Sequence, residues 1–392
     1  MKKSIVVLCL AVMVFACSGN ISPSDLGTSQ AEAIKVRNES LSFKQAFDGK
    51  FMIGAAINTR QAKDQDVKAM PLISKHFNSL TPENDMKWTR IQAQEGVFDF
   101  SGADAIVQKA KAENASLFGH TLIWHSQVPD WVFKDKSGQR VSREVLIERM
   151  RTHIFTLAGR YKDDIYGWDV LNEALNEDGT LRNSDWLQII GEQYIELAFS
   201  FAHEAAPNAK LYYNDYNLFK PKKRAGAVAL AKKLIDKGIP IHGIGAQGHY
   251  GLDVPVEELE QSIIAFAELG LDVVISELDI TVLPFPEPEK MGADVNLRYD
   301  LQSFYNPFEN GISQEASEQL RQGYLSLFAL FLKHHDKIGR VTFWGVSDAH
   351  SWRNNWPMTG RTDFPLVFDR QYKAKPFVSE ILDMAIESKQ EY

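Results

Sequence analysis

Short apolar runs alternate with longer amphipathic stretches from residue 45 onward in this 392-residue chain. This alternation predicts an α/β protein whose parallel strands close into a (β/α)8 barrel (a TIM barrel), built as a single domain. The runs are apolar throughout, as strands are when both faces of a sheet are covered. Apolar residues recur at three- and four-residue spacing in the stretches between them, which is typical of helices. An open, doubly wound sheet is the alternative.

The predicted elements follow one another in strict order. Strands are expected at residues 51–57, 77–80, 117–124, 165–171, 211–214, 241–247, 273–280 and 341–346. Helices are expected at residues 61–74, 103–113, 143–160, 186–206, 222–237, 256–269, 317–335 and 374–388. Ser142 before the third helix and Pro255 before the sixth are typical start signals. Residues 284–312, rich in Pro, Asn and aromatic side chains, predict a long loop of the kind that shapes a binding site.

The first 17 residues consist of a start with two lysines, an apolar run over residues 4–16, and Cys17. The run is shorter than the ~20 residues that span a bilayer, but it suits a secretory signal. Its Val-Phe-Ala-Cys ending resembles a bacterial lipobox, in which the cysteine is lipidated. We expect a signal peptide over 1–16, a lipid-anchored tether over 17–44 and the barrel over 45–392. The protein would then be exported and anchored to a bacterial membrane, on its periplasmic or cell-surface face; an ordinary signal cleaved near Ala16 is the alternative.

Composition excludes several classes of protein. A net charge of −8 argues against a nucleic-acid partner held by phosphate neutralisation. The only cysteines, Cys9 and Cys17, precede the barrel, which therefore has no disulfide and no thiolate nucleophile. A G-x-G-x-x-G match at residues 243–248 overlaps a strand instead of opening a helix, so it is a poor nucleotide site. No metal or cofactor is expected, although a metal-dependent barrel hydrolase is a distant alternative.

Polar and aromatic side chains stand where the predicted strands end, and in a barrel these ends share one rim. Two of them, Glu173 and Glu277, follow strands that lie roughly opposite each other. Two carboxyl groups on either side of a bound sugar are the arrangement that hydrolyses glycosides. His249 and Asp279 should keep Glu277 charged, whereas Glu173 has no cation nearby in the sequence, which suits a protonated carboxyl. The alternative is that each glutamate caps a helix or joins a surface ion pair.

Other side chains at the rim suit a sugar. Indole rings can stack on the apolar face of a sugar ring, and tryptophans at or just after strand ends are Trp88, Trp124, Trp344, Trp352 and Trp356; plugging the rim is the alternative role. Donors and acceptors for ring hydroxyls are Glu83, Asn84, Lys87, His120, Asn172 and Gln247. A non-catalytic carbohydrate-binding protein would need the aromatic residues but not the carboxyl pair.

Four segments carry a resemblance to a known family: TPENDMKW at 81–88, GHTLIWHSQ at 119–127, WDVLNEA at 168–174 and SELDI at 276–280. They are similar to the signatures of glycoside hydrolase family 10, the endo-1,4-beta-xylanases, and the likeness extends over about residues 45–385. An Asn-Glu pair alone would be weak evidence, because many barrel glycosidases share it. The second segment together with Glu-Asn-x-Met-Lys-Trp is specific.

The resemblance implies a barrel that cleaves xylan and xylooligosaccharides with retention of anomeric configuration. It implies that Glu173 is the acid/base and Glu277 the nucleophile, supported by His249 and Asp279. Implied contacts to the sugars are Glu83, Asn84, Lys87, His120, Trp124, Asn172, Gln247, His249, Trp344 and Trp352. We expect a monomer that needs no cofactor; a retaining barrel glycosidase acting on cellulose, mixed-linkage glucan or mannan is the alternative.

Overall fold

The computed structural model describes residues 41–287, 290 and 292–388. The predicted signal peptide and Cys17 lie outside the described residues. From Ser42 onward, the described residues form one compact unit. This unit begins three residues before the predicted start of the barrel because the short helix α2 (Phe43–Ala46) packs into it. The Phe43 side chain is fully buried, with its ring centroid 5.6 Å from that of Phe343.

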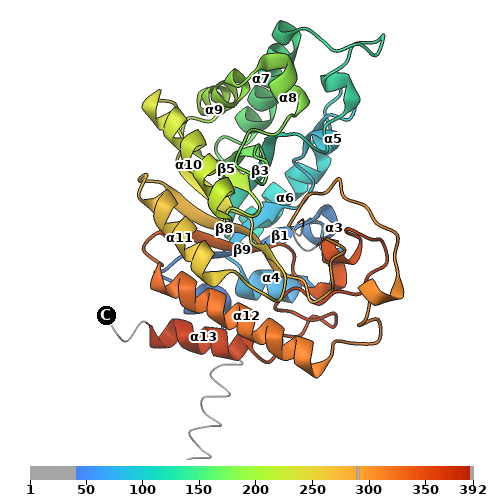
Figure 1. The fold of residues 1–392 in the computed structure, drawn as a ribbon, viewed down its shortest axis with the longest axis vertical. Coiled ribbons are helices and arrows are strands. Elements are labelled where there is room, and N and C mark those ends of the chain that lie inside the picture. Colours follow the sequence, from blue (N-terminus) through green and yellow to red (C-terminus); the bar gives the residue numbers. More distant parts are fainter. Residues whose placement is uncertain (1–40, 288–289, 291, 389–392) are drawn as a thin grey trace, which may run out of the picture. The chain divides into compact units, whose positions relative to one another are not determined.

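Eight parallel strands close into a ring, which confirms the predicted barrel (Figure 1). The strands of the ring are β1 (Met52–Ile57), β2 (Ser79–Pro82), β3 (Ser116–Trp124), β4 (Ile165–Asn172), β5 (Lys210–Asp215), β6 (Gly243–Ala246), β8 (Asp272–Ile280) and β9 (Ile338–Phe343). Pairing of β1 with β9 and of β6 with β8 completes the circle. The two-residue strand β7 (His249–Tyr250) follows β6 and pairs with the end of β8.

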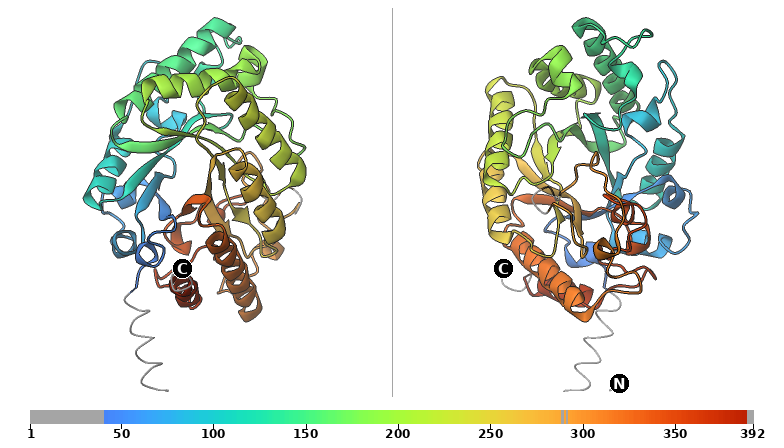
Figure 2. Two further views of the ribbon diagram at one scale, coloured as in Figure 1. Left: turned by 90° about the vertical axis from the view of Figure 1, so that its left-hand side faces the viewer. Right: turned by 45° about the vertical axis from the view of Figure 1, so that its right-hand side comes forward.

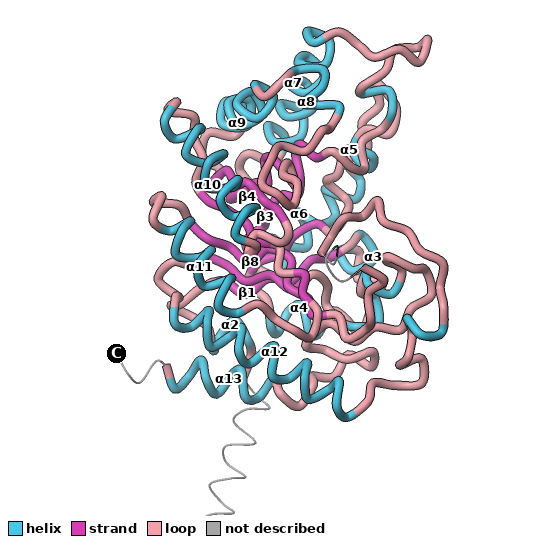
Figure 3. The backbone as a smooth tube through the Cα atoms, in the orientation of Figure 1, coloured by secondary structure: helices cyan, strands magenta, loops and turns pink. Residues whose placement is uncertain are grey.

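Helices surround the strands, which lie at the centre of the fold (Figure 3). The longer helices are α6 (Ser101–Ala112), α7 (Arg143–Arg160), α9 (Gln193–Ala205), α10 (Pro221–Asp236), α11 (Val256–Ala267), α12 (Gln314–Lys333) and α13 (Val378–Glu387). Helices α10, α11 and α12 lie side by side along the outside of the barrel (Figure 2). Among the described residues, no helix has the length and apolar character needed to cross a bilayer.

Two predicted helices are each broken in two. The stretch predicted at 61–74 forms α3 (Thr59–Ala62) and α4 (Met70–His76), because Asp64 is left-handed and Pro71 fits only the first turn of a helix. The stretch predicted at 186–206 forms α8 (Asp185–Ile190) and α9, separated at Gly191, whose φ of 81° ends α8. Both breaks lie on the outer layer, so the barrel itself is unaffected.

The carboxyl ends of the strands meet at one rim, where short elements and loops replace regular structure. Besides β7, these elements are the helices α5 (Trp88–Ile91), η1 (Asp130–Val132), η4 (Asp348–His350) and η5 (Trp352–Asn354). The predicted loop at 284–312 follows β8 and includes the short helix η3 (Ser303–Tyr305). This rim carries the polar side chains that the sequence places at the strand ends.

Candidate active site

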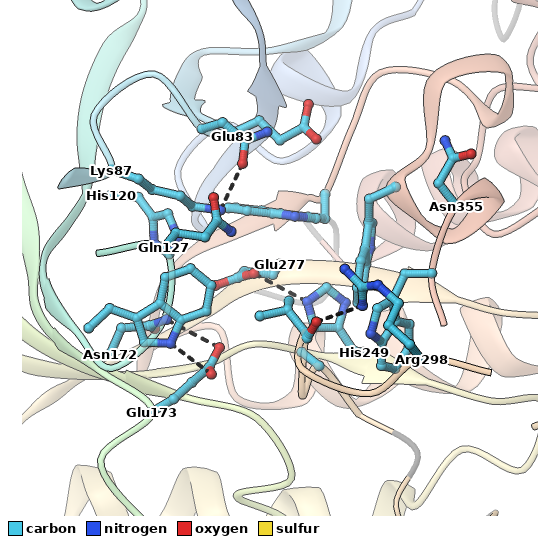
Figure 4. Close-up of a pocket in the computed structure, with 17 residues that line it drawn as sticks. Glu83, Lys87, His120, Gln127, Asn172, Glu173, His249, Glu277, Arg298 and Asn355 are labelled. Carbon is cyan, nitrogen blue, oxygen red and sulfur yellow. Dashed lines mark hydrogen bonds and ion pairs between the residues drawn. The ribbon is translucent and has the colours of Figure 1, made fainter. Parts of the chain in front are cut away.

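A pocket of about 250 Å³ opens at this rim, and both glutamates line it (Figure 4). Glu173 directly follows β4, and Glu277 lies on β8, on the other side of the ring. The side chains of both residues are almost completely buried. The two carboxyl groups therefore face one shared cavity instead of two separate ones.

Glu173 is held in an unusual backbone conformation. Its φ of 55° is left-handed, which costs a non-glycine residue about 1 kcal/mol or more and persists only where the surroundings enforce it. Its N–H donates to the Asn214 carbonyl at 2.8 Å, and its own carbonyl accepts from Arg182 Nε at 3.1 Å. These contacts aim the side chain into the pocket. There Oε2 accepts from Trp124 Nε1 at 2.8 Å, and Oε1 accepts from Gln247 Nε2 at 3.1 Å.

Glu277 is surrounded by donors. Asn214 Nδ2 donates to its Oε1 at 2.7 Å, and His249 Nε2 lies 3.2 Å from its Oε2. The other ring nitrogen of His249 lies 3.0 Å from Asp279, which also receives two hydrogen bonds from Arg353. Burial lowers the pKa of His249, but Asp279 and Glu277 outweigh it and hold this pKa above its usual value. The raised pKa lets His249 carry a positive charge directly beside the Glu277 carboxyl group.

Two amide side chains connect the carboxyl groups. Asn214 Nδ2 donates both to Glu277 and to Asn172 Oδ1, the second at 2.9 Å. Asn172 in turn donates from Nδ2 to Glu173 Oε1 at 3.2 Å. Ser276 fixes the orientation of the Asn214 amide by donating to its Oδ1 at 2.6 Å. The relative position of the two glutamates is therefore set by a chain of buried hydrogen bonds that spans β4, β5 and β8.

The surroundings of Glu173 disfavour its charged form. Burial raises its pKa to about 7, and the negative charges of Asp215 and Glu277 add to this. Asp215 is fully buried and forms an ion pair of 2.9 Å with Lys223. Two carboxyl groups in one pocket thus have opposite electrostatic surroundings, which is what one acid and one nucleophile need at a single pH.

This difference predicts how activity depends on pH. The acid must carry its proton when substrate binds, and a pKa of about 7 keeps Glu173 protonated well above the usual range of a glutamate. We therefore expect kcat/KM on xylooligosaccharides to stay high through weakly acid pH and to fall tenfold per pH unit above about 7. Initial rates from pH 4 to 9 measure this. A basic limb already complete near pH 5 would contradict the assignment.

Most of the predicted sugar contacts line the same pocket. They are Glu83, Asn84, Lys87, His120, Trp124, Asn172, His249, Trp344 and Trp352. Lys87 Nζ donates to Asn84 Oδ1 at 3.0 Å and lies 5.0 Å from the centroid of the Trp124 ring. His120 is oriented by Asp169, which is 2.9 Å from its Nδ1. Burial lowers the pKa of His120 to about 3, so it faces the pocket as a neutral ring.

Three predicted residues occupy other positions. Gln247 and Asp279 are not among the lining residues: Gln247 lies behind Glu173 and donates to it, and Asp279 lies behind His249. Trp88 is buried and stacks on His153, with ring centroids 3.7 Å apart, so it supports the rim. Contacts across the barrel decide the positions of Gln247 and Trp88, whereas Asp279 lies beside His249, with which the sequence groups it around Glu277.

The pocket also has lining residues beyond the sugar contacts that the family resemblance implies. These lining residues are Gln127, Ala293, Val295, Arg298, Asn355 and Trp356. Gln127 ends one of the family-like segments and Trp356 belongs to the rim tryptophans, so both had a signal. Ala293, Val295 and Arg298 belong to the 284–312 loop, which contains no recognisable motif. The described residues contain no cluster of His, Cys, Asp and Glu that could hold a metal ion, and the expectation of a metal-free reaction stays a prediction.

Comparisons with known proteins agree with this geometry. The family model described as glycosyl hydrolase family 10 matches residues 42–384. Endo-1,4-beta-xylanase A of Xylanibacter ruminicola is 42% identical over 85% of this chain and 90% of its own, and the endo-1,4-beta-xylanase of Geobacillus stearothermophilus is 42% identical over 86% and 96%. A solved GH10 endoxylanase from a sugarcane soil metagenome superposes with a TM-score of 0.82 at 41% identity, covering 88% of this chain and 99% of its own.

Proposed function

The chain belongs to glycosyl hydrolase family 10, and from this we infer that it is an endo-1,4-beta-xylanase that cleaves β-1,4-xylosidic linkages within xylan and xylooligosaccharides. The observation that carries this inference is the pair of buried glutamates that face one pocket with opposite electrostatic surroundings. Tryptophan and amide side chains around the pair supply the stacking surface and the hydrogen-bond partners that a chain of neutral sugars needs.

The first step breaks the glycosidic bond. Glu277 attacks the anomeric carbon from the face opposite the leaving sugar, and its Oε1 or Oε2 forms a covalent bond to that carbon. Glu173 donates its proton to the glycosidic oxygen, which leaves as a hydroxyl group. When Glu277 forms the covalent bond it loses its negative charge. The repulsion between this charge and Glu173 then disappears, which stabilises the newly formed Glu173 carboxylate.

The second step releases the sugar. Glu173, now a carboxylate, takes a proton from a water molecule, whose oxygen attacks the anomeric carbon while the bond to Glu277 breaks. Two inversions give net retention. Trp124 and Gln247 donate to Glu173 and hold its carboxyl group where it can serve both as acid and as base. Glu173 thus gives one proton to the leaving sugar and takes another from water, so it ends the cycle protonated, as it began.

A comparison of substrates tests the function. We expect release of reducing sugar from xylan to exceed release from carboxymethylcellulose and mannan by more than about tenfold at equal polymer mass, because the pocket must reject a bulkier sugar. NMR of the first products should show the β-anomer of the new reducing end before mutarotation. Greater activity on either of the other polymers, or α-anomer as the first product, would contradict the assignment.

We further propose that the enzyme is exported, anchored by a lipid on Cys17 and active as a monomer. The lipobox-like sequence before Cys17 supports the anchor. One chain supplies both glutamates and the residues around them, so a second copy is not needed to complete the pocket. Labelled palmitate should enter the full-length protein but not a Cys17→Ser variant, and equal labelling of both would contradict the anchor. Light scattering of the barrel region should give the mass of one chain.

A further inference from the structure

The 284–312 loop places an arginine in the wall of the active-site pocket. Arg298 is solvent-exposed, lines the pocket, and points its guanidinium group into it, across from Lys87 and Gln127 (Figure 4). Its Nη1 donates to the backbone carbonyls of Val295 and Leu297, each at 2.6 Å. These two bonds fix the direction of the side chain. A long, flexible residue is thereby held in one orientation at the cleft.

The rest of the guanidinium group is available for a ligand. Arg298 forms no ion pair with any acidic side chain among residues 41–287, 290 and 292–388, and its Nε and Nη2 donate to none of them. Arginine presents its N–H groups as a planar fork that matches a carboxylate. The sugars of a plain xylan backbone carry no charge, so an arginine that only met hydroxyl groups would leave its charge unused.

The other cation in the pocket does not compete for this role. Lys87 is buried, and burial lowers its pKa, an effect that the carboxyl groups of Glu277, Glu83 and Glu173 only partly offset. Its ammonium group therefore lies among the carboxyl groups around the reacting sugar. Arg298 lies across the pocket from Lys87 and is exposed to solvent, so its guanidinium group is accessible to a substituent that projects out of the pocket.

The loop that carries Arg298 is attached to the barrel at several points. Trp356 Nε1 donates to the Asp294 carbonyl at 3.1 Å, and Tyr299 N donates to the Pro357 carbonyl at 3.1 Å. Asp294 also lies 3.9 Å from Arg182, the residue that holds the backbone of Glu173. Such anchoring places the charge of Arg298 at a defined position before substrate binds, which lowers the entropic cost of recognition.

We propose that Arg298 binds the carboxylate of a uronic acid branch on the xylan chain, so that the enzyme favours acidic xylan over a neutral chain of the same shape. This inference rests on the proposed xylanase function and deepens it. In this arrangement the guanidinium group of Arg298 pairs with the carboxylate of the branch, while the main chain of the xylan lies between Glu173 and Glu277.

The test compares two polymers that differ only in charge: a glucuronoxylan, and the same polymer after its carboxyl groups are reduced to primary alcohols. We expect wild-type kcat/KM to be higher on the acidic polymer. The ratio of the two values should fall about threefold to fivefold in Arg298→Gln, the size of effect that a solvent-exposed pair of charges produces. Raising the salt concentration to about 0.5 M should shrink the wild-type ratio, because salt screens exposed charges.

Lys290→Gln is the matched control. It removes the same charge from the same loop, but Lys290 is not among the residues that line the pocket. This variant should keep the wild-type ratio. An equal wild-type rate on both polymers, or an unchanged ratio in Arg298→Gln, would overturn the role of Arg298. Activity of the wild-type enzyme on unbranched xylooligosaccharides separates the outcomes, because its absence would instead contradict the xylanase function.

Discussion

Replacing Glu277 with alanine should abolish the hydrolysis of xylan, with kcat falling by at least about 10⁴-fold. Without the carboxylate no covalent intermediate forms, and the donors Asn214 and His249 remain at an empty position. Alanine also leaves space for a small anion next to these donors. Added azide should therefore attack an activated aryl xyloside and yield a glycosyl azide of inverted, α configuration.

The measurement is a steady-state assay on xylan together with NMR of the azide product. Glu268→Ala, which removes an exposed glutamate at the end of α11, is the matched control and should keep wild-type activity. Circular dichroism should show that Glu277→Ala is folded. If the folded variant keeps more than about one per cent of wild-type kcat, Glu277 is not the nucleophile.

Replacing Glu173 with alanine should produce a different pattern, in which the loss depends on the leaving group. Xylan has a poor leaving group that needs a proton, so kcat/KM should fall by about 10²- to 10⁴-fold. A dinitrophenyl xyloside departs without protonation, so its first step should proceed at close to the wild-type rate. The second step then lacks its base, and the covalent intermediate on Glu277 should accumulate as a burst of dinitrophenol.

Azide distinguishes the two glutamates by stereochemistry. In Glu173→Ala it should attack the intermediate from the side of the missing acid/base and give the β-glycosyl azide, the opposite anomer to that from Glu277→Ala. The dependence of kcat/KM on pH above about 7 should also disappear, since the group that titrates there is gone. Equal losses on xylan and on the dinitrophenyl xyloside would contradict the role of Glu173.

The contacts of Arg182 should hold the backbone around residue 173 in the same conformation in both variants. Arg182 donates to the Glu173 carbonyl and, from Nη2, to the Tyr216 hydroxyl at 2.7 Å. The left-handed backbone at residue 173 is therefore fixed by residues that neither substitution removes. Loss of activity in either variant reports on the missing carboxyl group, and the shape of the rim is expected to persist.

Much of the fold follows from local patterns. The strand before Glu173 is predicted at 165–171 and is β4, Ile165–Asn172, because a nearly continuous apolar run is typical of a strand that is covered on both faces. The prediction of a continuous helix over 186–206 was wrong at Gly191, where α8 ends. A single glycine inside an apolar helical pattern is only a weak sign of a helix end. Pro71 carried a stronger signal for the break between α3 and α4.

The sequence by itself determined which side chains share the rim, since parallel strands in a ring deliver their carboxyl-terminal residues to one side of the barrel. Glu173 and Glu277 could be paired on that ground alone. Tertiary structure decided what surrounds each of them. Asn214 reaches Glu277 across 63 residues and Gln247 reaches Glu173 across 74, and such contacts depend on strand register and on the closed ring. The position of Arg298 likewise depends on where an irregular loop packs, which no periodic pattern encodes.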